Sequence, residues 1–180
     1  MLWQNRIPRR SKNTQMKNLQ SEEIKSTLTT ATSSDQLVQT FKITMKTQVS
    51  APAEAVFGAL LEEIGPRYQG PTGASLRLSV EPWPGGRWFR DYGNNTGYCW
   101  ALVQSIMPPT LLELYGPMFM SSPVTSQVRF RLRIENAMTE VSLEHDARGD
   151  IPLAFRDGTH LDERWKAILT SVRANAERRG

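Results

Sequence analysis

Residues able to bind metals or act as nucleophiles are scarce in this sequence. The 180-residue chain has two histidines, His145 and His160, and one cysteine, Cys99. A zinc site needs about four cysteine or histidine ligands at short spacing. The sequence therefore predicts no metal, no cofactor and no internal disulfide, and a single cysteine is typical of a reducing compartment such as the cytoplasm. We expect Cys99 to be a small buried side chain.

The segment 126–146 alternates apolar and charged residues and predicts a β-hairpin. Asn136-Ala137 fits a two-residue turn between its strands. With this turn both faces agree on one register, which sets the following residues opposite one another: Arg133 and Glu140, Arg131 and Ser142, Arg129 and Glu144, Leu132 and Val141, Phe130 and Leu143. We interpret the arginine row as a solvated face with cross-strand ion pairs, and the alternative is a site for an anionic partner.

The same register places His145 on the apolar face, near the end of its strand. An imidazole there can hydrogen-bond to a ligand, act as a general base or be a structural histidine. His160 falls in the first turn of the last predicted helix, where we expect it to be solvated. The alternation does not fix the faces of Asp91, Tyr92 and Glu113. Because the sequence lacks a phosphate loop, a nucleophile elbow and a paired-carboxylate spacing, it favours binding over catalysis.

The elements that position these residues follow the order strand, helix, strands, long helix. Residues 40–49 alternate like a half-buried strand, and residues 51–65 carry an apolar helical stripe. Strands with turn signals between them are predicted at 75–81, 87–92, 97–107, 111–115 and in the hairpin. The last helix repeats apolar side chains over four turns: Leu161, Trp165, Ile168, Leu169, Val172 and Ala176. An antiparallel sheet with one apolar face and a helix with one apolar stripe must pack together.

A motif of two tryptophans, EPWPGGRWF, covers residues 81–89. Gly85 and Gly86 permit a tight turn that other residues cannot adopt. We expect Trp88 to enter the sheet after this turn and Trp83 to lie at the rim.

Charge and composition separate residues 1–38 from residues 39–180. The first segment is polar and holds six Lys/Arg against three Asp/Glu, a net charge of +3, whereas the rest has a net charge of +1. The first segment has too few apolar residues to bury a face, so we expect a disordered basic tail followed by one domain. A nearly neutral domain is a poor match for nucleic acid. No apolar run approaches the roughly 18–20 residues that cross a bilayer, so membrane insertion is not predicted.

This order of elements, with its motifs, resembles the SRPBCC or START-like superfamily, the helix-grip fold of the birch pollen allergen. Within it the chain resembles the branch named for homologues of the heat-shock-protein-90 ATPase activator. The similar pieces span residues 41–176: APAEAVFGALLE, PWPGGRWF, Gly97 before a strand ending at Pro108-Pro109, VTSQVRFRL, TEVSLEHD and Trp165. The chain departs from the family pattern at PRYQGP, where a tryptophan-rich segment is common, and at Glu163-Arg164, where a glycine usually precedes the tryptophan.

The resemblance implies an α+β helix-grip fold, with a curved antiparallel sheet of six or seven strands wrapped around the C-terminal helix. It also implies a cavity between them that binds a hydrophobic or amphipathic small molecule. The cavity candidates are Trp88, Trp100, Tyr115, Phe130, Leu132, Leu143, His145 and Trp165. In the alternative these side chains only fill the core.

Two other functions stay open. One is a chaperone-activator-like interaction with a protein, through a surface around Trp83 and the arginine row. The other is a cyclase-type or hydratase-type enzyme that uses His145 or an acidic residue in the cavity.

Overall fold

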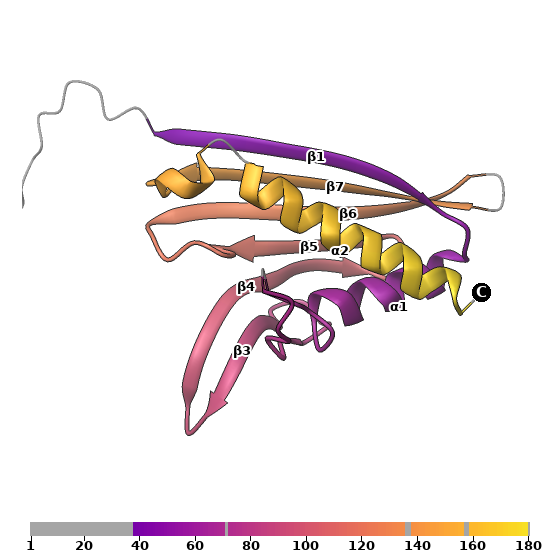
Figure 1. The fold of residues 1–180 in the computed structure, drawn as a ribbon, viewed down its shortest axis with the longest axis horizontal. Coiled ribbons are helices and arrows are strands. Elements are labelled where there is room, and N and C mark those ends of the chain that lie inside the picture. The colour runs from indigo at the N-terminus through magenta and orange to yellow at the C-terminus, as the bar shows by residue number, and fades with distance from the viewer. Residues whose placement is uncertain (1–37, 71, 136–137, 157–158, 180) are drawn as a thin grey trace, which may run out of the picture. The chain divides into compact units, whose positions relative to one another are not determined.

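The computed structural model describes residues 38–70, 72–135, 138–156 and 159–179 (Figure 1). Its strands are β1 (Gln39–Val49), β2 (Ser79–Val80), β3 (Arg87–Gly93), β4 (Thr96–Met107), β5 (Leu111–Gly116), β6 (Val124–Glu135) and β7 (Met138–Gly149). Its helices are α1 (Ala53–Ile64), the short 3-10 helix η1 (Leu153–Phe155) and α2 (Thr159–Glu177). The predicted tail, apart from Val38, and the predicted Asn136-Ala137 turn lie outside the described residues.

The strands form one antiparallel sheet in the order β1-β7-β6-β5-β4-β3-β2. β2 to β7 follow one another as a meander, and β1 joins the sheet by pairing with β7 along its whole length. α2 lies across one face of the sheet, and α1 lies beside the C-terminal half of α2 (Figure 1). The predicted α+β helix-grip fold is confirmed. In the described ranges no helix is both long and apolar enough to span a membrane.

The apolar stripe of α2 faces the sheet, as its spacing predicts. Ile168 is 6% exposed and Val172 is fully buried, so the stripe does not face water. The sheet supplies buried side chains from each of its long strands. The core members on which this packing depends include Ile43, Trp88, Val103, Leu114, Phe130, Leu143, Leu161, Trp165 and Leu169.

The β6–β7 hairpin has the predicted register at all five pairs. One arginine of the row, Arg129, contacts both Glu113 and Glu144, the latter at 3.6 Å. Glu140 instead pairs with Lys46 of β1 at 3.0 Å. The charged face of the hairpin therefore shares its ion pairs with both neighbouring strands. Glu113 projects onto this outer face.

The turn within EPWPGGRWF depends on its two glycines. Gly85 has a φ of +83°, which L-residues rarely adopt. A Cβ on Gly86 would lie 2.1 Å from the carbonyl oxygen of Glu81. Arg87 closes the turn with three hydrogen bonds to the Glu81 carboxylate, from its backbone N and Nε at 2.9 Å each and from Nη2 at 2.6 Å. These bonds lower the pKa of the Glu81 carboxyl to about 2.

The two tryptophans of this motif lie where the sequence predicts them. Trp88 is fully buried, and its Nε1 donates a hydrogen bond of 2.7 Å to the carbonyl oxygen of Ile64, the last residue of α1. Trp83 is 54% exposed. The turn thus anchors β3 to α1 through one ring and leaves the other in solvent.

Two expectations about the strands are wrong. The strand predicted at 75–81 shortens to β2, because Arg77 has a φ of +48° that interrupts an extended backbone. Cys99 is exposed, not buried. The reason is that β3 and β4 bend away from the other strands (Figure 1), so residues 91–99 at the far end of this hairpin are exposed on both faces. We call residues 90–99 the arm, and it also carries Asp91 and Tyr92 in solvent.

Candidate functional site

An aromatic cluster lies between the sheet and α2. Its ring centroids are 5.1–6.2 Å apart, mostly in edge-to-face arrangements. The cluster consists of Tyr68, Trp88, Trp100, Phe119, Phe130, His145 and Trp165. Because each ring contacts another ring of the set, side chains occupy this part of the interface.

Seven of the eight predicted cavity residues lie on the inner side of the sheet or on α2. Six of them are at most 4% exposed, and Trp100 is half-buried. The six are Trp88, Phe130, Leu132, Leu143, His145 and Trp165. Their contact with a ligand stays a prediction.

Tyr115 is a wrong prediction, because its side chain lies on the opposite face of the sheet. Its neighbour Leu114 is fully buried, and consecutive residues of a strand point to opposite faces. Tyr115 is 47% exposed and pairs with Gln127 of β6, beside Asp146 on the outer face. β5 carries apolar side chains at consecutive positions, Leu111-Leu112 and Leu114-Tyr115, and these hid its alternation.

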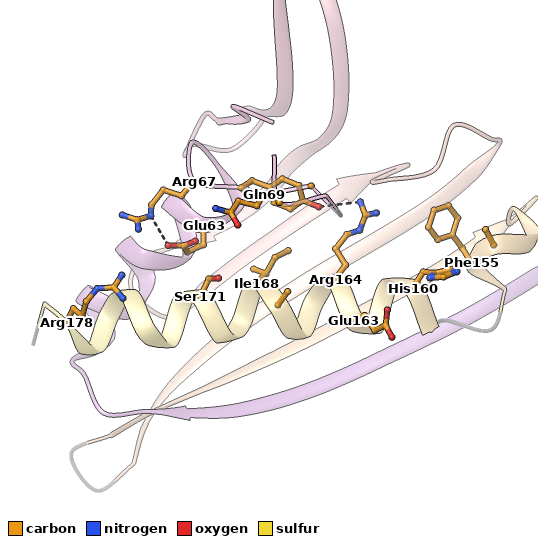
Figure 2. Close-up of a pocket in the computed structure, with 15 residues that line it drawn as sticks. Glu63, Arg67, Gln69, Phe155, His160, Glu163, Arg164, Ile168, Ser171 and Arg178 are labelled. Carbon is orange, nitrogen blue, oxygen red and sulfur yellow. Dashed lines mark hydrogen bonds and ion pairs between the residues drawn. The ribbon is translucent and has the colours of Figure 1, made fainter. Parts of the chain in front are cut away.

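A groove of about 750 Å³ opens beside the aromatic cluster, between α2 and the segment that follows α1 (Figure 2). One wall is formed by Glu63, residues 67–70 and Gly73, the other by α2, and Phe155 of η1 lies at one end. This side of the groove is bordered by residues at helical spacing: His160, Arg164, Ala167 and Ser171 of α2, and Arg178 just after it. The small side chains at the middle of this stripe leave the room that forms the groove.

Arg164 lies where the groove meets the aromatic cluster. Figure 2 shows its side chain reaching from α2 toward the opposite wall. Its Nη1 donates to the hydroxyl of Tyr68 at 3.3 Å, and its Cζ lies 4.5 Å from the ring centroid of Phe119. Burial raises the pKa of the Tyr68 hydroxyl, so this partner is neutral. Arg164 therefore holds two cluster rings at the groove wall.

The opposite wall carries an ion pair between Arg67 and Glu63. Arg67 Nε lies 3.0 Å from Glu63 Oε1, and Asn175 Nδ2 donates to the same oxygen at 2.8 Å. Glu63 is 7% exposed. This arrangement ties α1 to α2 and neutralises one of the arginines that border the groove.

His145 is fully buried at the inner end of the cluster. Its Nδ1 accepts a 3.0 Å hydrogen bond from Trp165 Nε1, so its proton sits on Nε2. Nε2 has no hydrogen-bond partner among the described residues. Burial lowers the pKa of the imidazole to about 4. His145 is therefore neutral near pH 7, and the lone pair that a general base would use is occupied by the indole.

The remaining residues that could do chemistry lie outside the aromatic cluster. His160 is exposed, as predicted, and borders the groove. Within the described ranges no three His, Cys, Asp or Glu side chains gather closely enough to hold a metal ion.

Sequence reasoning missed the groove residues because it looked for the ligand only between the apolar faces. A signal was present. The two places where the chain departs from the family pattern, residues 66–71 and Glu163-Arg164, supply Arg67, Tyr68 and Arg164 to the groove. Their spatial meeting depends on tertiary packing.

The sheet, the short helix after β1 and the long C-terminal helix define a helix-grip fold, and comparison with solved structures supports this fold. CalU16 from Micromonospora echinospora superposes with a TM-score of 0.53 at 18% identity, covering 75% of each chain. An uncharacterised protein from Rhizobium leguminosarum gives 0.59 at 15% identity, over 78% of this chain and 97% of that one. The Aha1 dimer from Colwellia psychrerythraea gives a TM-score of 0.53 at 16% identity, over 76% of this chain and 96% of that one. At these identities the likeness establishes the fold.

No protein-family model matches the sequence, and no curated protein matches it significantly.

Proposed function

We propose that the protein binds a hydrophobic or amphipathic small molecule at the groove, between α2 and the segment after α1. The observation that carries this proposal is a groove of about 750 Å³ whose inner wall is continuous with the aromatic cluster through Tyr68. Small-molecule sites are concave and roughly 300–1,000 Å³ in volume. The border of this groove is largely polar, which suits an amphipathic ligand whose apolar part reaches the rings. The predicted cavity residues other than Tyr115 then form the apolar interior toward which the ligand extends.

Phe119 supports this role because it links two groove residues, Tyr68 and Arg164, to the deeper rings. It is half-buried and contacts Trp88, Trp100 and Trp165 at centroid distances of 5.1–5.6 Å. It follows Met118, whose φ is +55°, in the connection from β5 to β6.

A thermal-shift screen of lipophilic compounds tests the proposal. At a ligand concentration of 100 Kd, binding stabilises the native state by about 2.7 kcal/mol, which raises the Tm of a domain of this size by about 5–10 °C. The groove is blocked by Ala167→Phe, because Ala167 is exposed and borders it. Thr170→Phe is the matched control, since Thr170 is exposed on the same helix and does not border the groove.

We expect the shift in the wild type and in Thr170→Phe, and its loss in Ala167→Phe. A screen without any shift, or an equal shift in Ala167→Phe, contradicts the proposal.

A second candidate function is a chaperone-activator-like interaction with a protein, and the arm favours it. Tyr92 and Tyr98 on the arm are 52% and 59% exposed, and their rings contact each other at 5.9 Å. Arg90 Cζ lies 4.7 Å from the centroid of Tyr92. Exposed aromatic and arginine side chains are enriched at protein interfaces. The resemblance of the sequence to homologues of the heat-shock-protein-90 ATPase activator motivates that chaperone as the partner to test.

The ATPase rate of that chaperone with and without this protein tests the second candidate. We expect stimulation that is lost in a Tyr92→Ser/Tyr98→Ser variant and kept in Tyr115→Ser, which changes an exposed tyrosine away from the arm. No stimulation by the wild type removes this candidate.

We propose a cytoplasmic location as well. Cys99 is a free cysteine with an exposed side chain, and an unpaired exposed thiol persists best in a reducing compartment. Fractionation of cells that express the tagged full chain tests this, and recovery in the membrane or secreted fraction contradicts it.

A further inference from the structure

The charge balance of the groove is uneven. The arginines that border it are Arg67, Arg164 and Arg178, and the carboxylates are Glu63 and Glu163. Arg67 and Glu63 neutralise each other at 3.0 Å. Glu163 is exposed, so water screens its charge. Of these groups, Arg164 is the half-buried cation without a carboxylate partner among the described residues.

Arg164 has hydrogen-bonding capacity that its present contacts do not use. A guanidinium carries five N–H donors in a planar fork. Its one hydrogen bond among the described residues goes to the Tyr68 hydroxyl at 3.3 Å, which is long and leads to a neutral group. The ring of Phe119 at 4.5 Å covers one face of the guanidinium and leaves its N–H edge available. Such an edge is matched by a carboxylate or a sulfonate, which accepts two parallel hydrogen bonds.

The side chains around Arg164 indicate the chemistry of the rest of the ligand. Ile168, one turn further along α2, is an apolar side chain that borders the same groove. Phe155 lies toward the other end of α2 beside His160 (Figure 2). An acidic group at Arg164 therefore places its attached body against apolar side chains on either side.

We propose that the natural ligand is an organic anion, with a carboxylate or similar acid on Arg164 and an apolar body in the groove. This inference rests on the proposed small-molecule function. On binding, the acid replaces Tyr68 as the main hydrogen-bond partner of Arg164. Arg178 directly follows α2 and lies 14 residues after Arg164, a separation of about 21 Å at the rise of a helix, so it does not share the same acidic group.

Two fluorescent probes that share one apolar body test this inference. The anionic probe is 8-anilinonaphthalene-1-sulfonate, and the neutral one is N-phenyl-1-naphthylamine, which lacks the sulfonate. Both are titrated into the full chain and into Arg164→Gln, Arg178→Gln and Arg131→Gln variants. Arg131 is the control because it is exposed on the outer face of β6.

We expect the wild type to bind the sulfonate at least tenfold more tightly than the neutral probe. Arg164→Gln loses this preference and keeps its affinity for the neutral probe, whereas Arg178→Gln and Arg131→Gln behave like the wild type. Raising NaCl from 50 to 500 mM weakens binding of the sulfonate alone, a readout that needs no variant.

Equal binding of both probes, unchanged by Arg164→Gln, overturns the anion inference and leaves the proposed function standing. Loss of the preference in Arg178→Gln alone overturns the assignment to Arg164. If neither probe binds the wild type, both the inference and the proposed function are contradicted.

Discussion

At the scale of single residues, the hydrogen bond between Trp165 and His145 links the helix to the sheet. Trp165 Nε1 donates to His145 Nδ1 at 3.0 Å, with both side chains fully buried. A protonated imidazole carries a hydrogen on both nitrogens and cannot accept this bond. The pair therefore holds α2 on β7 only while His145 is neutral.

This pair predicts a pH dependence of stability. The folded pKa of about 4 lies below the ordinary value of 6.5. Between these values the unfolded chain binds the proton and the folded chain does not, so the free energy of unfolding falls as the pH falls. From pH 7.5 to 5.5 we expect a loss of about 1.4 kcal/mol, measured by urea unfolding. The carboxylates titrate mostly below this window.

Two controls make the assignment to His145 specific. His145→Gln should flatten the dependence between pH 7.5 and 5.5, and His160→Gln, at an exposed site, should keep it. If the glutamine variant does not fold, the NMR titration of the His145 ring in the wild type gives the answer directly. A midpoint near 6.5 for that ring contradicts this account.

Trp165 also has a predictable steric role. It is fully buried, and its ring contacts Phe119 at 5.5 Å and Phe130 at 5.8 Å. Trp165→Ala should lower the free energy of unfolding by about 3–5 kcal/mol, because it leaves a cavity and an unpaired His145 Nδ1. Trp83→Ala is the matched control: with Trp83 54% exposed, we expect a change within about 0.5 kcal/mol. Equal losses in the two variants, in denaturant melts, would argue against this packing.

At the scale of elements, two glycines predict opposite effects of the same substitution. Gly58 lies inside α1, and a Cβ there meets nothing within 4 Å. Gly58→Ala should therefore stabilise the protein by about 0.5–1 kcal/mol through helix propensity and unfolded-state entropy. At Gly86 a Cβ would lie 2.1 Å from the Glu81 carbonyl oxygen, so Gly86→Ala should destabilise the protein. Thermal unfolding gives both signs, and the account is wrong if the signs agree.

At the scale of elements, part of the fold could be predicted from the sequence. The register of β6 and β7 was predictable because both faces of the hairpin constrain it, with charged pairs on one side and apolar pairs on the other. The helix stripe was predictable because Leu161, Trp165 and Val172 follow a single period. The exposure of Cys99 and the outward face of Tyr115 were not predictable from the sequence. The bend of the β3–β4 hairpin and the inner face of β5 are set by packing between distant segments. The groove forms between two segments that are distant in the sequence, so it could not be predicted for the same reason.

At the scale of the whole molecule, residues 38–179 contain the sheet, both long helices and the core that joins them. The first 37 residues have few apolar side chains with which to add to that core. Deleting residues 1–37 should therefore change the Tm by less than about 2 °C. Differential scanning calorimetry of the two chains measures this, and a larger fall in Tm shows that the deleted segment contributes to the fold.

The central claim is that ligands enter at the groove next to Arg164 and not at the arm. An NMR titration of the ¹⁵N-labelled full chain with 8-anilinonaphthalene-1-sulfonate tests it most directly. We predict chemical-shift changes at the amides of Tyr68, Arg164 and Ala167 and none at Tyr92 and Tyr98. Changes confined to the arm, or no changes at saturating probe, would contradict the account.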